Sequence, residues 1–425
     1  MNIDALYELF LQYPSVETDS RKVKKGDIFF ALKGPNFNGN QYLEQALQAG
    51  ASYCVADEET AFTNEKIILT GDSLQTLQQL AKKHRMQFNI PFIAITGSNG
   101  KTTTKELVSE VLSTTYTTYT TFGNLNNHIG VPLTLLRIKK DAQVAVVEMG
   151  ANHQKEIASY CEYTMPTHGI ITNCGKAHLE GFGGEEGVKK GKGELFDYLR
   201  AHRGIAFINN DYDYLHELSA GIQQIIGYGE KSGDIVGHVK ADETFLEVTI
   251  TKGANLPSIQ TQLVGDYNLP NILTAVCIGK TFGVSDGNIK SALEGYTVSN
   301  SRSQLVHKGT NAIILDAYNA NPSSMKAAIR NFAHMEGDKK VLILGGMMEL
   351  GSESIKEHAA IVQLIQSNPW YKVVLVGKDY LDLPDNITHL DSSAEARDWF
   401  QKEGLSEAQV LIKGSRSMQM EKVIE

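Results

Sequence analysis

The most informative segment of this 425-residue chain is Ala94-Ile95-Thr96-Gly97-Ser98-Asn99-Gly100-Lys101-Thr102-Thr103. An apolar run, residues 92–95, leads into it, and helical periodicity over residues 103–113 follows. A loop between a strand and a helix can aim successive backbone N–H groups at phosphate oxygens, and the helix dipole favours the same negative charge. The segment therefore predicts a phosphate-binding loop at the edge of a parallel α/β sheet.

Each residue type in this loop fits nucleotide binding. Gly97 and Gly100 allow close backbone approach, Lys101 can reach the β- and γ-phosphates, and the Thr102 hydroxyl can bind magnesium. Ile95 stands where the general pattern has its first glycine. The alternative interpretation is a Gly-Lys-Thr turn that binds no nucleotide.

Two further residues are candidates for magnesium ligands together with Thr102. Glu148 ends the apolar run 144–148, and His178 follows a predicted strand at 169–172. The carboxyl ends of parallel strands meet at one edge of a sheet, where such sites form. Taken singly, each could be a solvated polar group at a strand end or a hydrogen-bonded histidine.

The rest of the chain alternates short apolar runs with helical periodicity, which is typical of parallel α/β units. We expect three domains, at residues 1–88, 89–300 and 301–425. The predicted strands are 92–95, 144–148, 169–172, 205–208, 312–315, 341–344, 373–376 and 410–412. The predicted helices are 103–113, 189–199, 269–282 (with Gly283 as a C-cap), 323–334 and 353–367.

Composition narrows the function classes. Hydrophobic residues make up 42 % and charged residues 21 %, as in ordinary globular proteins. The net charge of -9 does not indicate nucleic-acid binding. The four cysteines show no zinc-ligand spacing, and no apolar run approaches the roughly 18 residues of a membrane span. With no signal-peptide pattern at the N-terminus, we expect a cytoplasmic protein without membrane insertion.

Several segments, in order along nearly the whole chain, resemble the Mur ligase family. They are residues 96–103, Gly123-Asn-Leu-Asn-Asn-His-Ile-Gly-Val-Pro-Leu-Thr134, Glu148-Met-Gly-Ala-Asn-His153, Ala177-His-Leu-Glu-Gly-Phe-Gly183, Asp316-Ala-Tyr-Asn-Ala-Asn-Pro322, Met347-Met-Glu-Leu-Gly351 and Lys413-Gly-Ser-Arg-Ser417. The segments at 148, 177, 316 and 347 are most similar to the branch that adds D-alanyl-D-alanine. The shortened phosphate loop of this family also accounts for Ile95.

This resemblance implies a fold and a reaction. The fold is α/β, with a central P-loop-type parallel sheet domain between a small N-terminal UDP-binding domain and a C-terminal Rossmann-like domain. The reaction is ATP-dependent joining of D-alanyl-D-alanine to a UDP-linked muramoyl-tripeptide through an acyl phosphate. Two magnesium ions and a monomeric protein are expected. We further expect the C-terminal domain to close over the site and exclude water from the acyl phosphate.

The resemblance also assigns roles to individual residues. Lys192 matches a lysine that the family carries as a carbamate, so that it can help to hold a second magnesium ion. Arg302 matches a γ-phosphate sensor at a domain junction, and the catalytic set becomes Lys101, His178, Lys192 and Arg302. Without the family match, Lys192 would be read as a helix-surface lysine.

Nucleotide and substrate contacts complete the assignment. The ATP contacts are Gly97, Ser98, Asn99, Gly100, Lys101, Thr102, Thr103, Asn268, Asn271, Arg302, Asp316, Tyr318 and Asn319. Asp266-Tyr267 replaces the usual basic-histidine pair before Asn268. The substrate contacts are Ser20, Arg21, Asn124, Asn126, Asn127, Lys413, Ser415 and Arg416. For Ser20 and Arg21 an ordinary Ser-Arg turn is the alternative, and for the last three it is surface charge.

Three rival functions are compatible with parts of this pattern. They are a sister ligase that adds a diamino acid, a folylpolyglutamate synthase, and a nucleotide-binding regulatory protein without catalysis. Residues 316–322 argue against the first two. The joint presence of Lys101, Glu148, His178 and Lys192 argues against the third, because a binder needs only some of these groups.

Overall fold

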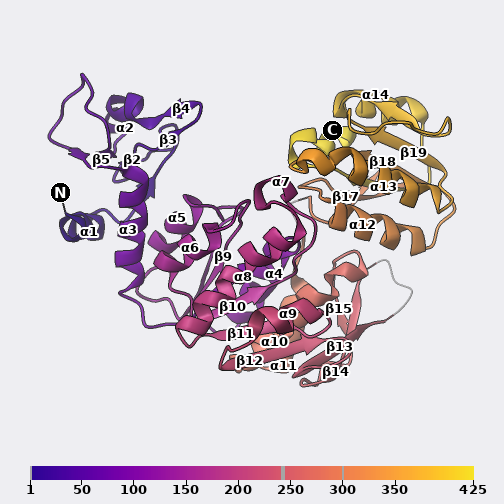
Figure 1. Ribbon diagram of the computed structural model, residues 1–425, viewed down its shortest axis with the longest axis horizontal. Helices are drawn as coiled ribbons and strands as arrows, with labels where there is room; N and C mark the ends of the chain where they lie inside the picture. The colour runs from indigo at the N-terminus through magenta and orange to yellow at the C-terminus, as the bar shows by residue number, and fades with distance from the viewer. Residues whose placement is uncertain (1, 241–244, 299–300) are drawn as a thin grey trace.

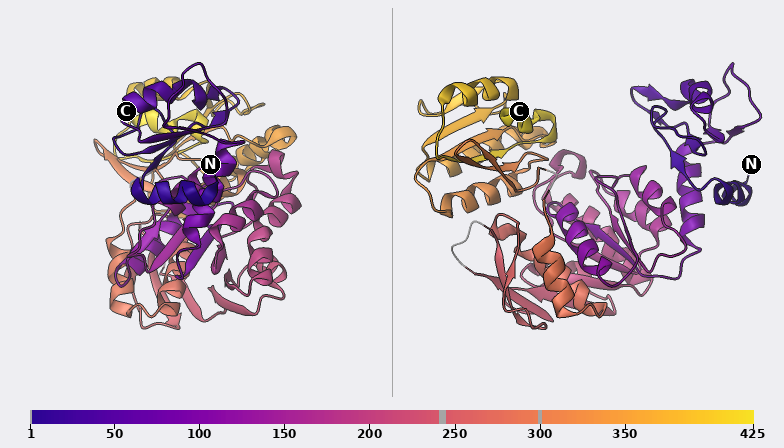
Figure 2. Two further views of the ribbon diagram at one scale, coloured as in Figure 1. Left: turned by 90° about the vertical axis from the view of Figure 1, so that its left-hand side faces the viewer. Right: turned by 180° about the vertical axis from the view of Figure 1, so that it is seen from behind.

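The computed structural model describes residues 2–240, 245–298 and 301–425, which form three α/β lobes, each built on its own sheet. In Figure 1 the N-terminal and C-terminal lobes stand on either side above the central lobe. The views in Figure 2 show the same arrangement from the side and from behind. The three-domain α/β fold expected from the sequence is confirmed. Among the helices of the described ranges, none has the length and apolar character that a membrane crossing requires.

The N-terminal lobe carries a four-stranded parallel sheet in the order β1-β2-β5-β6 and a small β3–β4 hairpin. Its elements are α1 (Ile3–Gln12), β1 (Val16–Glu17), β2 (Ile28–Phe30), β3 (Lys33–Gly34), β4 (Phe37–Asn38), α2 (Leu43–Gln48), β5 (Tyr53–Ala56), β6 (Ile67–Leu69) and α3 (Ser73–Arg85).

Helix α3 joins the N-terminal lobe to the central lobe. His84 Nε2 lies 2.8 Å from the Ile138 carbonyl, and Arg85 donates to the carbonyls of Thr164 and Met165 at 2.8 and 2.9 Å. These carbonyls belong to the central lobe, so the end of α3 is fastened there. The expected boundary between the first two domains at residue 88 therefore stays a proposal. The expected boundary at residue 300 lies outside the described residues and also stays a proposal.

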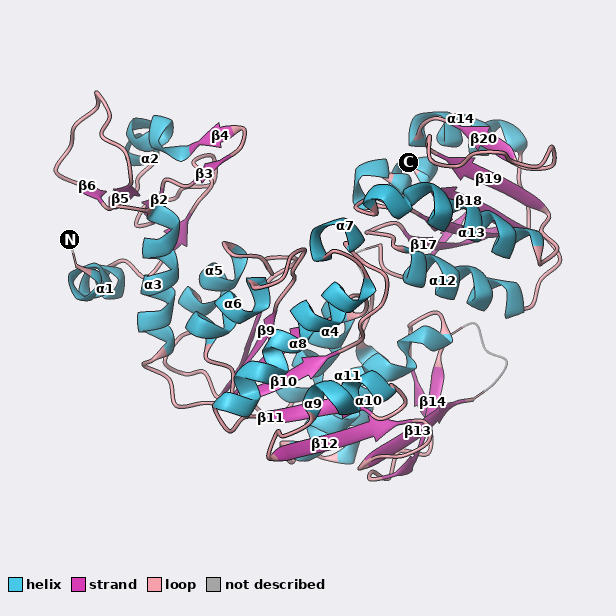
Figure 3. Ribbon diagram, viewed as in Figure 1, coloured by secondary structure: helices cyan, strands magenta, loops and turns pink. Residues whose placement is uncertain are grey.

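The central sheet has the order β15-β14-β13-β12-β11-β10-β7-β9-β8 and is covered by helices on both faces (Figure 3). Its strands are β7 (Phe92–Thr96), β8 (Thr118–Thr120), β9 (Val144–Glu148), β10 (His168–Ile171), β11 (Ile205–Asn209), β12 (Gln224–Gly229), β13 (Ile235–Val239), β14 (Glu247–Lys252) and β15 (Ile259–Gln260). Its helices are α4 (Lys101–Ser113), α5 (Gly130–Leu136), α6 (Glu156–Thr164), α7 (Leu179–Phe182), α8 (Glu185–Ala201), α9 (Asp213–Ser219), α10 (Leu269–Thr281) and α11 (Asp286–Gly295).

Strand order in this sheet places the ligand crevice. Successive units run from β7 toward β9 and β8 on one side, then toward β10, β11 and β12 on the other. Ligands of open α/β sheets bind at such a reversal, outside the carboxyl ends of the strands. The phosphate-binding loop follows β7, directly at this reversal. Beyond β13 the sheet continues through the antiparallel strands β14 and β15, which the sequence pattern had not indicated.

The C-terminal lobe is a six-stranded sheet in the order β16-β17-β21-β18-β19-β20, parallel except for the β16–β17 pair. Its elements are β16 (Gln304–Lys308), β17 (Asn311–Asp316), α12 (Pro322–His334), β18 (Lys340–Gly345), α13 (Ser354–Gln366), β19 (Lys372–Val376), β20 (Thr388–Leu390), α14 (Ser393–Glu403) and β21 (Gln409–Lys413). All strands and helices predicted from the sequence are confirmed to within a few residues. Gly283 follows the last turn of α10 with φ +74°, the left-handed conformation of a helix-ending glycine.

Candidate active site

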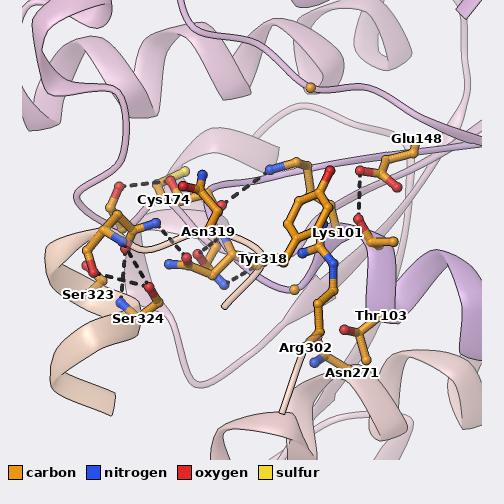
Figure 4. Close-up of a pocket in the computed structure, with 18 of the residues that line it drawn as sticks. Lys101, Thr103, Glu148, Cys174, Asn271, Arg302, Tyr318, Asn319, Ser323 and Ser324 are labelled. Atoms are coloured by element: carbon orange, nitrogen blue, oxygen red, sulfur yellow. Dashed lines mark hydrogen bonds between the residues drawn. The ribbon is translucent and has the colours of Figure 1, made fainter. Parts of the chain in front are cut away.

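One cavity of about 1060 Å³ collects most of the predicted site residues. It lies between the carboxyl edge of the central sheet and the first residues of the C-terminal lobe, and Figure 4 shows part of its lining. The predicted residues that line it are Ser98, Asn99, Gly100, Lys101, Thr102, Thr103, Asn124, Asn126, Asn127, Glu148, His178, Asn268, Asn271, Arg302, Asp316, Tyr318, Asn319 and Lys413. Residues more than 300 positions apart thus face one space.

The phosphate-binding loop has a geometry that only glycine satisfies at two positions. Gly97 has φ +143°, and a Cβ there would lie 2.0 Å from Thr172 Oγ1. Gly100 has φ +80°, and a Cβ there would lie 2.6 Å from Asn271 Oδ1. The loop is therefore packed against its neighbours on both sides, with its backbone near the cavity.

Lys101 begins helix α4 with its ammonium folded back over the loop. Its Nζ donates to the carbonyls of Gly97 and Ser98 at 2.7 and 3.3 Å. Burial lowers the pKa of Lys101 to about 8, which the Glu148 carboxylate opposes and the Arg302 guanidinium reinforces. A cation held this close to the start of a helix suits the binding of a polyphosphate.

Glu148 presents an unpaired carboxylate oxygen at the end of β9. The residue is fully buried; its Oε1 accepts from Thr102 Oγ1 at 3.1 Å and from Asn126 Nδ2 at 2.7 Å. Its Oε2 is buried without a hydrogen-bond partner among the described residues. An unpaired buried carboxylate is costly unless a cation neutralises it. Oxygen donors from Thr102 and Glu148 therefore fit magnesium, a cation that prefers oxygen ligands.

His178 reaches the cavity from the loop after β10, but its ring also contacts the C-terminal lobe. Its Nδ1 lies 2.5 Å from Glu349 Oε2. Hydrogen bonding to His178 lowers the pKa of Glu349 against the opposing effect of burial. In the described part of the chain, no three Asp, Glu, His or Cys side chains converge as a ready-made metal cluster. The magnesium prediction therefore depends mainly on Thr102 and Glu148.

Lys192 lies beneath the cavity rather than on its surface. It is 1 % exposed, its Nζ donates to the Ala151 carbonyl at 2.9 Å, and the Nζ stands 4.9 Å from the centre of the Phe182 ring. Burial holds the pKa of Lys192 well below its ordinary value, and the charge of Lys101 acts in the same direction. Lys192 is therefore not a helix-surface lysine, unlike Lys190 of the same helix, which is exposed.

Asn268 and Asn271 tie the start of α10 to the phosphate-binding helix. Asn271 Nδ2 donates to Asn268 Oδ1 at 2.9 Å, and Asn271 Oδ1 accepts from Thr104 Oγ1 at 3.0 Å. Both asparagines are nearly buried and both line the cavity. Tyr267 belongs to the Asp266-Tyr267 pair noted in the sequence. Its hydroxyl lies 2.7 Å from Ser303 Oγ, and either group can be the donor. It thereby joins the central lobe to the junction with the C-terminal lobe.

Arg302 stands at that junction with its guanidinium available to the cavity. Its Cζ lies 3.6 Å from the centre of the Tyr318 ring, a cation–π arrangement, and Figure 4 shows the two side chains together. The Nε of Arg302 is buried without a hydrogen-bond partner among the described residues. An unsatisfied buried guanidinium nitrogen beside Lys101 favours an anion in the cavity.

Asp316 and Lys413 form an ion pair at the carboxyl ends of β17 and β21, with Nζ 2.5 Å from Oδ2. Lys413 also donates to the Asn319 carbonyl at 3.3 Å, and the Arg416 N–H donates to Asn319 Oδ1 at 3.4 Å. Ser415 lies beside this group but outside the cavity lining, bonded to Ser417 at 3.3 Å. Arg416 pairs with Glu421 at 3.2 Å. These residues are therefore near the cavity, and their part in binding stays a prediction.

Ser20 and Arg21 lie in the N-terminal lobe, apart from this cavity. Ser20 is nearly buried, whereas the Arg21 side chain is 82 % exposed and makes a two-bond contact with Asp19, both bonds 2.8 Å long. The guanidinium lowers the pKa of Asp19 to about 2. Neither residue is brought to the phosphate-binding loop, as expected if they bind another part of a long substrate.

Several lining residues were not predicted. They include Tyr160, Asn173, Tyr212, Tyr214, Asn321, Ser323 and Ser324. Asn173 and Tyr212 come two or three residues after β10 and β11, at the same sheet edge as Glu148, the last residue of β9, so the same strand-end argument could have found them. Residues 321–324 belong to the N-terminus of α12, where Asn321 forms a capping box with Ser324.

Comparisons with known proteins agree along the whole chain. Three family profiles match in order: "Mur ligase family, catalytic domain" over residues 12–85, "Mur ligase middle domain" over 95–279 and "Mur ligase, glutamate ligase domain" over 301–416. The UDP-N-acetylmuramoyl-tripeptide--D-alanyl-D-alanine ligase of Bacillus subtilis (strain 168) is 33 % identical over 96 % of this chain and 92 % of its own.

Solved structures give the same result. MurF from Acinetobacter baumannii superposes with a TM-score of 0.88 at 31 % identity, covering 96 % of this chain and 92 % of its own. MurF ligase from Thermotoga maritima in complex with ADP gives 0.86 at 27 % identity, covering 97 % and 96 %. The similarity therefore covers all three lobes and both junctions between them.

Proposed function

The chain belongs to the Mur ligase family, and from this premise we infer that it joins D-alanyl-D-alanine to UDP-N-acetylmuramoyl-tripeptide at the expense of ATP. The products are UDP-N-acetylmuramoyl-pentapeptide, ADP and phosphate, and the reaction belongs to peptidoglycan synthesis in the cytoplasm. The full-length similarity to ligases of this name supports the choice of substrates over those of a diamino-acid ligase or a folylpolyglutamate synthase.

One structural observation carries the assignment of the chemistry: the cavity holds the phosphate-binding loop, the unpaired Glu148 carboxylate and Arg302 together. A regulatory nucleotide binder needs the loop alone. A transferring phosphoryl group also needs positive charge arranged around it. The residues of both lobes supply this arrangement, which favours an enzyme.

In this proposal, Thr102, Glu148 and His178 would hold magnesium, and Lys192 would join them as a carbamate. Magnesium, when bound, supplies positive charge that stabilises the phosphoryl group during transfer. Lys192 suits carbamate formation because burial lowers its pKa, which favours the neutral amine that attacks carbon dioxide. A protonated lysine offers no lone pair to a metal.

The chain's own residues then act on ATP and the tripeptide. Backbone N–H groups of residues 100–103 and the Lys101 ammonium bind the phosphates, and Arg302 faces the γ-phosphate. The terminal carboxylate of the tripeptide attacks that phosphorus, which releases ADP and leaves an acyl phosphate. The amine of D-alanyl-D-alanine attacks the acyl carbon, the C–O bond to phosphate breaks, and the amine proton is lost to the medium.

Substrate contacts follow from the positions of the lobes. The muramoyl part is assigned to Asn124, Asn126 and Asn127, which line the cavity next to Glu148. The UDP end is assigned to Ser20 and Arg21 in the N-terminal lobe. Lys413, Ser415 and Arg416 are proposed to bind the dipeptide or the acyl phosphate, with Asp316, Tyr318 and Asn319 beside the nucleotide. A monomer holds every one of these groups.

Phosphate release tests the proposal. ATP, magnesium and UDP-N-acetylmuramoyl-tripeptide should give phosphate only when D-alanyl-D-alanine is present, with a pentapeptide product by mass spectrometry. Turnover with UDP-N-acetylmuramoyl-dipeptide and a diamino acid, but not with the tripeptide, would move the protein to the sister branch.

A further inference from the structure

The loop after β10 braces the phosphate-binding loop. Thr172 Oγ1 donates to the Asn99 carbonyl at 2.6 Å, and the Asn99 N–H donates to Asn173 Oδ1 at 3.1 Å. Ser98 Oγ donates to the Gly175 carbonyl at 2.8 Å. The loop segment 98–99 is thus held in place by hydrogen bonds to residues 172–175.

The next residues of the same loop dock the C-terminal lobe. The Lys176 N–H donates to Ser323 Oγ at 2.9 Å, and Asn321 Nδ2 donates to Asn99 Oδ1 at 2.7 Å. A Cβ on Gly175 would lie 2.8 Å from Ser323 Oγ. The two lobes are therefore so close at this point that only glycine fits. The bracing segment and the docking segment are continuous in the chain.

A buried carboxylate completes this contact. Glu357, on α13, has a side chain only 3 % exposed, and its Oε1 lies 2.6 Å from Lys176 Nζ across the lobe boundary. Its Oε2 lies 3.2 Å from Lys326 Nζ within its own lobe. Ion pairs with one buried, hydrogen-bonded partner are stronger than exposed pairs, and losing one partner is correspondingly costly.

We propose that Lys176 and Glu357 are positioning residues: their ion pair sets the C-terminal lobe on the phosphate-binding loop, so that Arg302, Asp316 and Asn319 face the nucleotide. Neither side chain is among the described residues that line the cavity. The pair therefore acts through the placement of other groups. The inference rests on the proposed function, since it concerns turnover at that site.

The expected effect is a loss of turnover without a loss of folding. Removing the Lys176 charge leaves Glu357 paired with Lys326, so the C-terminal lobe keeps its internal contact. We expect Lys176→Met to lower kcat/KM for ATP by about 5- to 150-fold, the usual range of coupling between two sites. The partly exposed Lys176 also predicts that wild-type turnover declines as salt rises, and that Lys176→Met shows a smaller decline.

The experiment is a double-mutant cycle with Lys176→Met, Glu357→Gln and both together, measured by phosphate release with the tripeptide and D-alanyl-D-alanine. Lys83→Met is the matched control, since Lys83 pairs with Asp4 at 2.7 Å inside the N-terminal lobe. In the Glu357→Gln background, the lysine substitution should change kcat/KM by less than about twofold, because the partner across the lobe boundary is already gone and the other partner of Lys176, Glu185 at 3.2 Å, lies in the central lobe itself. Small-angle scattering should show a larger radius of gyration for Lys176→Met and an unchanged one for Lys83→Met.

A lysine substitution that costs the same factor in both backgrounds would overturn the proposal. So would a loss of turnover with scattering identical to wild type, which would place Lys176 in direct contact with substrate. If the wild-type protein shows no turnover with these substrates, the proposed function fails. The radii of gyration of the wild type, the two single variants and the double variant then still decide whether the Lys176–Glu357 pair sets the arrangement of the lobes.

Discussion

Thr102 Oγ1 lies 3.1 Å from Glu148 Oε1, and the other oxygen of that fully buried carboxylate has no hydrogen-bond partner among the described residues. Thr102 lies at the start of α4, and Glu148 is the last residue of β9. The protein thus orients one carboxylate oxygen, and the other is the oxygen that we propose as a magnesium ligand.

Glu148→Gln should therefore impair magnesium use more than folding. We expect kcat/KM to fall by about 10²- to 10³-fold, the usual effect of losing one electrostatic contact to a transition state. The magnesium concentration for half-maximal rate should rise, and Glu162→Gln, an exposed change on α6, should affect neither quantity. Wild-type magnesium dependence in Glu148→Gln would rule out this carboxylate as a ligand.

Lys192→Ala should abolish most turnover, to about one hundredth of wild type or below, because a charged oxygen donor is lost from the phosphoryl site. Formate or acetate should restore part of the rate by replacing the carbamate oxygens. Lys190→Ala, an exposed change two residues earlier in the same helix, is the control and should behave as wild type. A fully active Lys192→Ala variant would show that no carbamate is needed.

Gly100→Ala and Gly283→Ala separate backbone strain from crowding at the phosphate loop. Both glycines have left-handed φ, +80° and +74°, so each substitution should cost about 1 kcal/mol of stability. Only at Gly100 would the new Cβ meet a neighbour, Asn271 Oδ1, at 2.6 Å. Calorimetry should find ATP binding weakened at least about tenfold (about 1.4 kcal/mol) in Gly100→Ala and unchanged in Gly283→Ala. Equal ATP affinity in both would contradict the packed geometry of the loop.

Acid should destabilise the protein through His168. Burial lowers the pKa of His168 from 6.5 to about 4, so between these pH values the unfolded chain binds a proton that the folded protein does not. The free energy of unfolding therefore falls as the pH falls through this window, by about 1 kcal/mol per pH unit for this residue.

Urea unfolding at pH 6.5 and 5.5 measures this effect. His168→Asn should lose about 1 kcal/mol less over that interval than wild type, whatever its stability at pH 6.5. His307→Asn, an exposed change on β16, should keep the wild-type dependence. An unaltered pH dependence in His168→Asn would show that this residue titrates normally in the folded protein.

Local signals in the sequence predicted eight strands of the central and C-terminal sheets, the phosphate loop and the edge at which Glu148 stands, because each depends on neighbours in the chain. The contacts of Lys176 with Glu357, and of His178 with Glu349, could not be predicted in this way. They depend on how two lobes are set against each other, and the partners are more than 150 residues apart. The antiparallel strands β14 and β15 were missed for a related reason, since their pairing extends a sheet whose other members are parallel.

Isotope transfer tests the central claim most directly. UDP-N-acetylmuramoyl-tripeptide labelled with oxygen-18 in both oxygens of its terminal carboxylate would be turned over with ATP, magnesium and D-alanyl-D-alanine, and the released phosphate analysed by mass spectrometry. Attack of that carboxylate on the γ-phosphate predicts one oxygen-18 atom in each phosphate and one in the new amide of the pentapeptide. Unlabelled phosphate released alongside the pentapeptide would contradict an acyl phosphate and the role proposed for this cavity.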